Sequence, residues 1–205
     1  MNYLQYIIAL CWIVFLIYWA WGARNLKKTK ETAWEDKPFR WVILGFIILI
    51  VLVGRLGLLD FVGLPTCTLE WSGCHIGFLN GTVLTSITIQ IISVVLAVLG
   101  LFVAIIARKE LADNWSGRID LKENHKLVTS GIYNYIRHPI YTGVLTMFFG
   151  TALFYESLVI WFLFVVFTVF FGYKLKAEER FMSKHFPKEY PEYKKHTKYL
   201  IPFVF

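Results

Sequence analysis

The sequence predicts an all-α integral membrane protein with about five transmembrane helices, and two observations carry this prediction. Hydrophobic residues fill 57% of the 205 positions, more than a soluble core of this size can bury. The basic residues stand between long apolar runs and not on one continuous face. The net charge of +7 therefore indicates membrane topology and no nucleic-acid partner.

The first three spans are predicted from long runs with few charges. About 20 residues cross the hydrocarbon core, and residues 3–22 do so without a charge. No basic residue precedes this run and no clear cleavage site follows it, so we expect it to be retained. Residues 41–59 form the second run, with Arg55 near one end. A third span is expected within residues 79–107.

The last two spans are predicted to form a tight helical hairpin. Residues 139–155 and 157–173 are apolar runs separated by Glu156 alone. Each is short for a full crossing, so tilt, local thinning or helix extension must make up the difference. Residues 174–186 contain no Gly or Pro, and Pro187 follows, so we expect the last helix to extend beyond the membrane.

The distribution of Lys and Arg predicts the orientation. Six lie in residues 24–40, six in 108–137 and eight in 174–198, whereas the loop at 60–78 has none. The positive-inside rule then places the amino terminus outside, the loop at 60–78 outside and the carboxyl terminus in the cytoplasm. The membrane is a bacterial or archaeal plasma membrane or the endoplasmic reticulum.

The cysteines and histidines do not predict a metal site. Cys67 and Cys74 share the outer loop, and a disulfide between them stays open. Cys11 lies inside the first span, where it is a small apolar residue. His125 and His138 have no third ligand at a helpful spacing, so we expect no metal.

Two polar stretches, residues 108–141 and 174–205, flank the hairpin and are expected to meet in space. We divide the chain accordingly into residues 1–107, with three spans and the outer loop, and a catalytic region at 108–205 with a cytoplasmic carboxyl-terminal cap. Arg137 and His138 precede Pro139, which disfavours helix before it and frees backbone groups for a ligand. A simpler alternative is that Arg137 and His138 only anchor a span at the headgroups.

Two adjacent carboxylates, Glu178 and Glu179, follow the last span. Neighbours on a helix point about 100° apart, so only one of them should face a given pocket. The functional interpretation is a carboxylate that holds a cationic or hydroxyl-bearing cofactor. The alternative is a solvated charged turn neutralised by the nearby Lys and Arg.

Together these residues resemble the carboxyl-terminal signature of the isoprenylcysteine carboxyl methyltransferase family and its bacterial and archaeal relatives. The ordered parts are residues 125–131 with Tyr133, Arg-His-Pro-x-Tyr-x-Gly at 137–143, Glu178-Glu179, and Phe-Pro-Lys-Glu-Tyr-x-x-Tyr from Phe186. The resemblance implies a membrane enzyme that uses S-adenosylmethionine, held over the ends of the last two spans. The implied cofactor contacts are His125, Lys126, Leu127, Val128, Tyr133, His138, Pro139, Ile140, Tyr141 and Glu178.

The same resemblance implies a substrate contact at Lys174, where the family usually has arginine. Lysine keeps the charge and loses the bidentate fork. A carboxylate acceptor is already ionised and needs no strong base, whereas an amine or thiol must lose a proton, with His138 and Glu178 the nearest candidates for catalysis.

The function that we predict is methyl transfer to a lipophilic small molecule or prenylated peptide, most concretely the carboxylate of a prenylated cysteine. The partners are this acceptor and membrane lipid, and we expect a monomer. Phospholipid amines and hydrophobic thiols are alternative acceptors. A nicotinamide-dependent enzyme similar to membrane sterol reductases and a non-enzymatic membrane scaffold are the alternatives outside this class.

Overall fold

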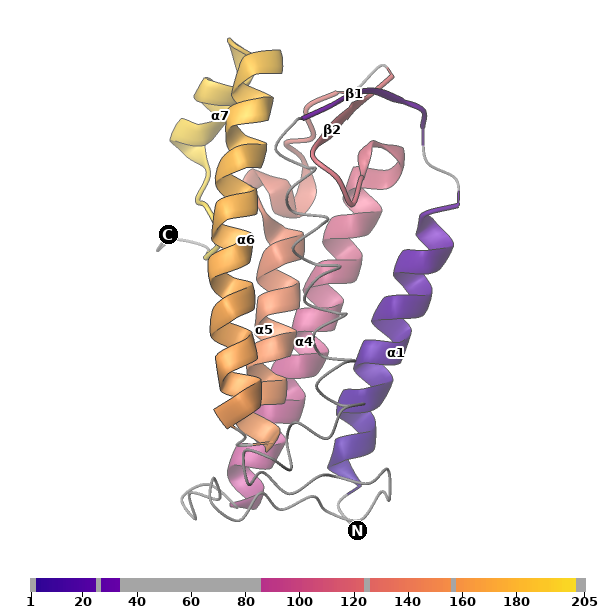
Figure 1. Ribbon diagram of the computed structural model, residues 1–205, viewed down its shortest axis with the longest axis vertical. Coiled ribbons are helices and arrows are strands. Elements are labelled where there is room, and N and C mark those ends of the chain that lie inside the picture. The colour runs from indigo at the N-terminus through magenta and orange to yellow at the C-terminus, as the bar shows by residue number, and fades with distance from the viewer. Residues whose placement is uncertain (1–2, 25–26, 34–85, 124–125, 156–157, 202–205) are drawn as a thin grey trace, which may run out of the picture.

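The computed structural model describes residues 3–24, 27–33, 86–123, 126–155 and 158–201. Within them, four long helices run side by side: α1 (Leu4–Gly22), α4 (Ile87–Leu111), α5 (Pro139–Tyr155) and α6 (Leu158–His185) (Figure 1). The predicted second span at 41–59, the outer loop at 60–78, Cys67 and Cys74 lie outside the described residues. The prediction of five spans and of their orientation therefore stays a prediction.

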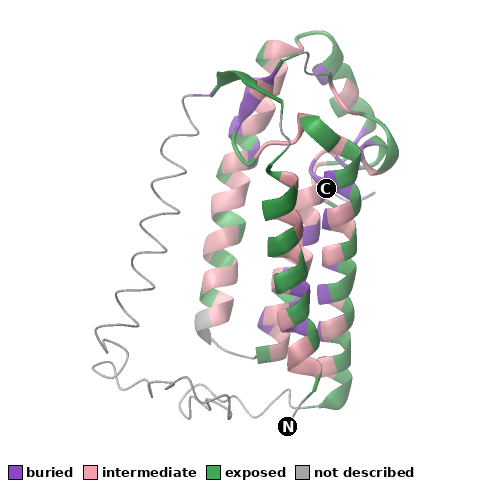
Figure 2. Ribbon diagram, turned by 90° about the vertical axis from the view of Figure 1, so that its right-hand side faces the viewer, coloured by how far each residue is buried: buried purple, intermediate pink, exposed green. Residues whose placement is uncertain are grey.

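Three of the described helices, α1, α4 and α6, are long and apolar enough to cross a membrane, while α5 is apolar but shorter, at 17 residues. Large hydrophobic side chains such as Leu16, Phe102 and Phe162 are exposed on α1, α4 and α6. Buried residues gather where the helices face one another, as Figure 2 shows. Exposed hydrophobic side chains on long apolar helices are the reverse of the pattern in a water-soluble protein and fit lipid as the surrounding solvent. The chain is therefore an integral membrane protein.

Small residues bring α4 and α5 into backbone contact. A Cβ atom on Gly100 would lie 2.5 Å from the Gly143 carbonyl oxygen, and one on Gly150 would lie 2.6 Å from the Ser93 carbonyl oxygen. On α4, Ala97 lies between Ser93 and Gly100, Ala104 follows Gly100 by one turn, and both alanines are fully buried. Without a hydrophobic driving force between helices in lipid, such close packing is a main source of helix association.

A two-stranded antiparallel sheet ties the segment after α1 to the segment after α4. β1 (Thr29–Thr32) pairs with β2 (Asp120–Lys122), and both lie near the end of the bundle where α1 ends (Figure 1). Ala33 and Ile119 beside the strands pack against Ala177 and Phe181 of α6. The sheet was not predicted, because strands of three and four residues carry too little periodicity to recognise.

The remaining elements are short and lie at the same end of the bundle. They are the 3-10 helices η1 (Ala112–Asn114) and η2 (Gly131–Asn134) and the helix α7 (Glu189–His196). α6 continues past its apolar part, which ends at Tyr173, through a charged segment to His185. The predicted helix extension is therefore observed, and it carries Lys174, Glu178 and Glu179 beyond the apolar span.

Candidate functional site

A cavity of about 470 Å³ lies between α1, α5, α6 and the polar elements at the end of the bundle. Its polar end is lined by side chains that include Arg118, His138, Lys174 and Glu178. Its apolar end is lined by aromatic and aliphatic side chains of the membrane helices, namely Trp12, Phe15, Trp19, Val144, Phe148, Phe167 and Phe171. The volume falls within the range of cofactor and small-molecule sites.

The carboxyl-terminal tail is hydrogen-bonded to the segment before α5. Because Pro139 starts the helix, Arg137 and His138 stay outside it. The Arg137 amide donates to the Lys198 carbonyl at 2.8 Å, and the Lys198 amide donates to the Tyr135 carbonyl at 3.0 Å. Thr142 also donates its hydroxyl to the Leu200 carbonyl at 2.6 Å. The tail therefore packs along the start of α5 through these hydrogen bonds.

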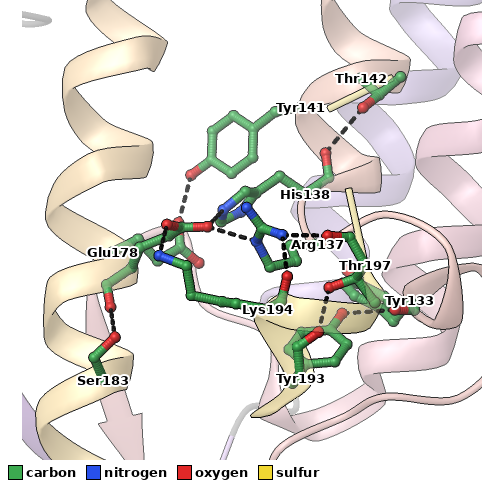
Figure 3. A network of polar contacts seen from close by, with 11 residues as sticks. Tyr133, Arg137, His138, Tyr141, Thr142, Glu178, Ser183, Tyr193, Lys194 and Thr197 are labelled. Carbon is green, nitrogen blue, oxygen red and sulfur yellow. Dashed lines mark hydrogen bonds and ion pairs between the residues drawn. The ribbon is translucent and has the colours of Figure 1, made fainter. Parts of the chain in front are cut away.

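Glu179 holds the tail in place by accepting hydrogen bonds from two cationic side chains. Its carboxylate takes Arg137 Nε at 2.6 Å and Lys194 Nζ at 2.6 Å, with His138 Nε2 at 3.5 Å. Arg137 also donates to the Thr197 carbonyl. Figure 3 shows Arg137, Lys194 and Thr197 turned toward one another. Burial by itself raises the pKa of Glu179, but the contacts with His138, Lys194 and Arg137 outweigh it and lower the pKa to about 2. Glu179 is therefore ionised at neutral pH.

Glu178 is turned toward the cavity instead, as the 100° offset between helix neighbours predicts. It accepts from the Tyr141 hydroxyl at 3.3 Å. Lys174, one helical turn earlier, donates to the Gly117 carbonyl at 2.9 Å and lies 6.0 Å from the Tyr141 ring. Among the described residues, no acidic side chain pairs with Lys174, so its positive charge is available to a ligand.

Tyr133, Tyr190 and Tyr193 line the polar end, and their phenols are neutral at neutral pH. The Tyr193 hydroxyl donates to the Tyr133 carbonyl at 2.6 Å. Burial raises the pKa of the Tyr133, Tyr190 and Tyr193 phenols. Tyr190 and Tyr193 come from α7, so α7 contributes to the wall of the cavity.

The structure brings most of the predicted site residues to one cavity. Those that line it are Leu127, Val128, Tyr133, His138, Ile140, Tyr141, Lys174 and Glu178. Pro139 is buried at the start of α5 and Lys126 is exposed, and neither is among the lining residues. His125 lies outside the described residues. Within the part of the chain that the structure describes, no three His, Cys, Asp or Glu side chains gather as metal ligands.

Sequence reasoning missed two parts of the cavity wall. One is the aromatic face of α1, formed by Trp12, Phe15 and Trp19, and the other is the segment 114–120 around β2. A helix that is apolar all round gives no periodic signal for the face it buries. Trp115 and Gly117 fall in a segment whose position is set by the β1–β2 pairing, which is long-range in sequence.

The fold and the cavity define a class: a helical membrane protein with a candidate ligand site at one end of its bundle, with a polar end and a larger apolar end. Residues 88–189 match the family model described as phospholipid methyltransferase. This match, over 102 of the 205 residues, is a similarity to that methyltransferase family. The matched residues include α4, α5, α6 and the start of α7, and so most of the polar end of the cavity.

Relatives with curated names support the same assignment. The chain is 34% identical to a protein-S-isoprenylcysteine O-methyltransferase of Saccharomyces cerevisiae over 56% of this chain and 49% of that one. It is 35% identical to protein-S-isoprenylcysteine O-methyltransferase B of Arabidopsis thaliana over 42% and 45%. The cobalt-zinc-cadmium resistance protein CzcN of Cupriavidus metallidurans is 34% identical over 52% and 48%. The predicted resemblance is confirmed, and the chain spans about half the length of the curated relatives it matches.

A solved structure shares the fold. A eukaryotic intramembrane Ras methyltransferase, isoprenylcysteine carboxyl methyltransferase, aligns with a TM-score of 0.51 at 22% identity. The alignment covers 57% of this chain and 45% of that chain.

Proposed function

We propose that this protein transfers a methyl group from S-adenosylmethionine to the carboxylate of a lipophilic acceptor, most concretely a prenylated cysteine. The observation that carries the proposal is the two-part cavity. Most of the predicted cofactor residues line it, and its apolar end enters the membrane-spanning helices. The names of the relatives supply the reaction class and the acceptor.

The residues present fit this cofactor. Glu178 and Tyr141 offer a carboxylate and a phenol to ammonium and hydroxyl groups. The rings of Tyr141 and Phe171 also line the cavity, and aromatic faces attract cations such as a sulfonium. Leu127, Val128 and Ile140 give it an apolar wall. When bound, the cofactor supplies a methyl group on a sulfonium cation.

Lys174 is the residue that favours an anionic acceptor. Its ammonium stands in the polar end, held by the Gly117 carbonyl without an acidic partner among the described residues. A carboxylate in the cavity would pair with it, and a cationic head would be repelled. Lys174 therefore binds and orients the acceptor in this proposal.

The remaining work of the chain is positioning and the exclusion of water. A carboxylate acceptor is ionised at neutral pH, so the site needs no strong base. Holding two reactants in near-attack geometry can supply roughly 7 to 11 kcal/mol. In this proposal α7, held by Glu179, forms part of the wall of the polar end through Tyr190 and Tyr193 and limits the access of water. His138, buried against Tyr199 with ring centroids 5.1 Å apart, and Glu178 shape the site beside the reacting groups.

The family description favours a phospholipid amine as the second candidate acceptor. An amine is mostly protonated at neutral pH and must lose its proton before it attacks. Its methylation should speed up as the pH rises toward the amine pKa, with His138 or Glu178 as the base. Methylation of a carboxylate should show no such rise, and this difference separates the two acceptors.

The proposed site faces the cytoplasm, because Lys and Arg concentrate on the side of the chain that carries it. A Lys188→Cys variant, in a background without the three natural cysteines, tests this orientation. A membrane-impermeant thiol reagent should label it in inverted vesicles and leave it unlabelled in right-side-out vesicles. Labelling in the opposite pattern would reverse the proposed topology.

Calorimetric titration with S-adenosylhomocysteine tests the cofactor directly. We expect saturable binding to the wild type and a loss of at least tenfold in affinity for Glu178→Gln. Glu189→Gln, an exposed carboxylate on α7, is the matched control and should bind like the wild type. Absence of binding by folded wild type in both detergent and lipid would exclude the proposal.

A further inference from the structure

The apolar end of the cavity closes on a group of aromatic rings inside the membrane-spanning helices. Trp12 of α1, Phe148 of α5 and Phe167 of α6 are the lining residues furthest along their helices from the polar end. Phe148 makes edge contacts with both Trp12, at 6.0 Å between ring centroids, and Phe167, at 5.5 Å. We call these three residues the aromatic floor.

The depth of the apolar end follows from helix geometry. Trp12 lies seven residues before Trp19, the last lining residue of α1, and Phe167 lies seven residues before Lys174. At 1.5 Å per residue, the floor is on the order of 10 Å from the polar end of the cavity. A hydrocarbon tail that follows the helices from the polar end therefore meets these rings.

Trp12 is fixed in this position by a hydrogen bond and by ring contacts. Its indole N–H donates to Thr151 Oγ1 at 3.1 Å, and the Thr151 hydroxyl donates in turn to the Met147 carbonyl at 2.9 Å. Phe15 packs against the indole edge at 5.9 Å. Tryptophan is usually enriched at the membrane interfaces, whereas Trp12 stands in the middle of its span with its N–H satisfied. These contacts make the indole a rigid barrier and not a mobile side chain.

Beyond the aromatic floor the helices are packed against one another. Ile8 and Cys11 of α1 form a buried cluster with Ala97 of α4 and Met147 of α5, and Trp12 packs against this cluster. A tail that passed Trp12 would have to displace these buried side chains. The indole is thus the last lining group before closely packed interior among the described residues.

We infer that Trp12 sets the longest hydrocarbon tail that the acceptor can carry. The inference rests on the proposed function for the identity of the acceptor and adds a specificity residue from outside the region that matches the family. Tails that end above the indole bind in the apolar end. Longer tails must bend or displace Trp12, which costs binding.

The experiment compares cysteine thioethers whose tails contain one, two, three or four isoprene units. Radiolabelled methyl transfer is measured for wild type, Trp12→Ala and Trp161→Ala. Trp161 contacts Phe149 and Phe164 on α5 and α6 and is not among the lining residues, so it controls for the loss of a membrane tryptophan. We expect kcat/KM to drop beyond a limiting tail length in wild type and Trp161→Ala. In Trp12→Ala, kcat/KM for the first tail beyond this limit, divided by kcat/KM for the shortest tail, should be at least tenfold higher than in the wild type.

Thr151→Val provides a second variant, because it removes the indole's acceptor with little change of shape. It should relax the length limit in the same direction by a smaller factor. The same length profile in the wild type, Trp12→Ala and Thr151→Val would overturn the inference.

A binding measurement separates this inference from the proposed function. Displacement of a radiolabelled thioether by the four compounds reports tail length without catalysis. A shifted binding profile in Trp12→Ala, together with no methyl transfer by any protein, would retain the inference and reject the reaction. Unchanged binding profiles with active wild type would reject the inference alone.

Discussion

At the residue scale, two neighbouring carboxylates have different tasks because the helix turns between them. Glu179 faces the tail and binds Arg137 and Lys194, whereas Glu178 faces the cavity and accepts from Tyr141. The sequence predicted that only one of the pair would face a pocket, since helix geometry requires it. Which partners Glu179 would find could not be predicted, because Lys194 and the tail are placed by tertiary packing.

The ammonium of Lys174, which has no acidic partner among the described residues, gives a prediction at this scale. Lys174→Ala should raise KM for a carboxylate acceptor by about 10- to 100-fold, since a charge-assisted hydrogen bond is worth about 1.5 to 3 kcal/mol. Lys174→Arg should keep or lower KM, because the guanidinium fork binds carboxylates bidentately. Steady-state methyl transfer measures both variants. An unchanged KM in Lys174→Ala, with affinity for S-adenosylhomocysteine also unchanged, would remove Lys174 from the acceptor site.

At the element scale, apolar length and breaking residues were sufficient to predict several helices. α5 coincides with the predicted run at 139–155, and α6 ends at His185, two residues before Pro187. The cavity wall on α1 could not be predicted, because Leu4–Gly22 is apolar on every face. β1 and β2 were not predicted from the sequence, because they are short and their pairing joins segments about 90 residues apart.

The contact between α4 and α5 predicts a strong effect of added volume. In Gly150→Val the new Cβ would lie 2.6 Å from the Ser93 carbonyl oxygen and 2.9 Å from the Ala97 amide nitrogen. We expect the variant to be destabilised by about 1 to 3 kcal/mol or more, through separation of the helices. Thermal unfolding in a fixed detergent measures this loss.

Gly172→Val on α6 is the matched control for this substitution. A Cβ at Gly172 would meet no atom within 4 Å, so this variant should unfold close to the wild-type temperature. Equal stability of the two variants would contradict the packing of α4 against α5.

The docking of α7 and the tail should depend on pH through Glu179. Its pKa falls from an ordinary value of 4.5 to about 2 in the folded chain, so the ionised form stabilises docking above pH 4.5. This stabilisation, on the order of 3 kcal/mol, is lost as the pH falls from 4.5 toward 2. Hydrogen exchange at the Arg137 and Lys198 amides, corrected for intrinsic rates, reports the docking.

Glu179→Gln should show increased exchange at these amides at pH 7, because Arg137 and Lys194 lose their charged acceptor. Glu189→Gln, on the exposed face of α7, should leave the exchange unchanged. Wild-type protection in Glu179→Gln would mean that the backbone contacts of the tail suffice without the ion pairs.

At the scale of the whole molecule, the membrane helices and the polar elements at one end of the bundle line the same cavity. The bundle supplies an apolar chamber with an aromatic floor. At the other end stand Tyr141 at the start of α5 and Lys174 and Glu178 on the extension of α6. The motifs after residue 108 were enough to predict most of the polar end. The apolar end depends on how α1 packs against α5 and α6, which composition alone does not determine.

The most direct test of the central claim is radiolabelled methyl transfer by the purified protein in lipid nanodiscs. The acceptors are a prenylated N-acetylcysteine and a phosphatidylethanolamine, each offered with and without excess S-adenosylhomocysteine. We predict a base-labile methyl ester on the prenylcysteine, whose formation is inhibited by S-adenosylhomocysteine and lost in Glu178→Gln. Methyl transfer to the phospholipid amine alone, or to neither acceptor by protein that binds S-adenosylhomocysteine, would contradict it.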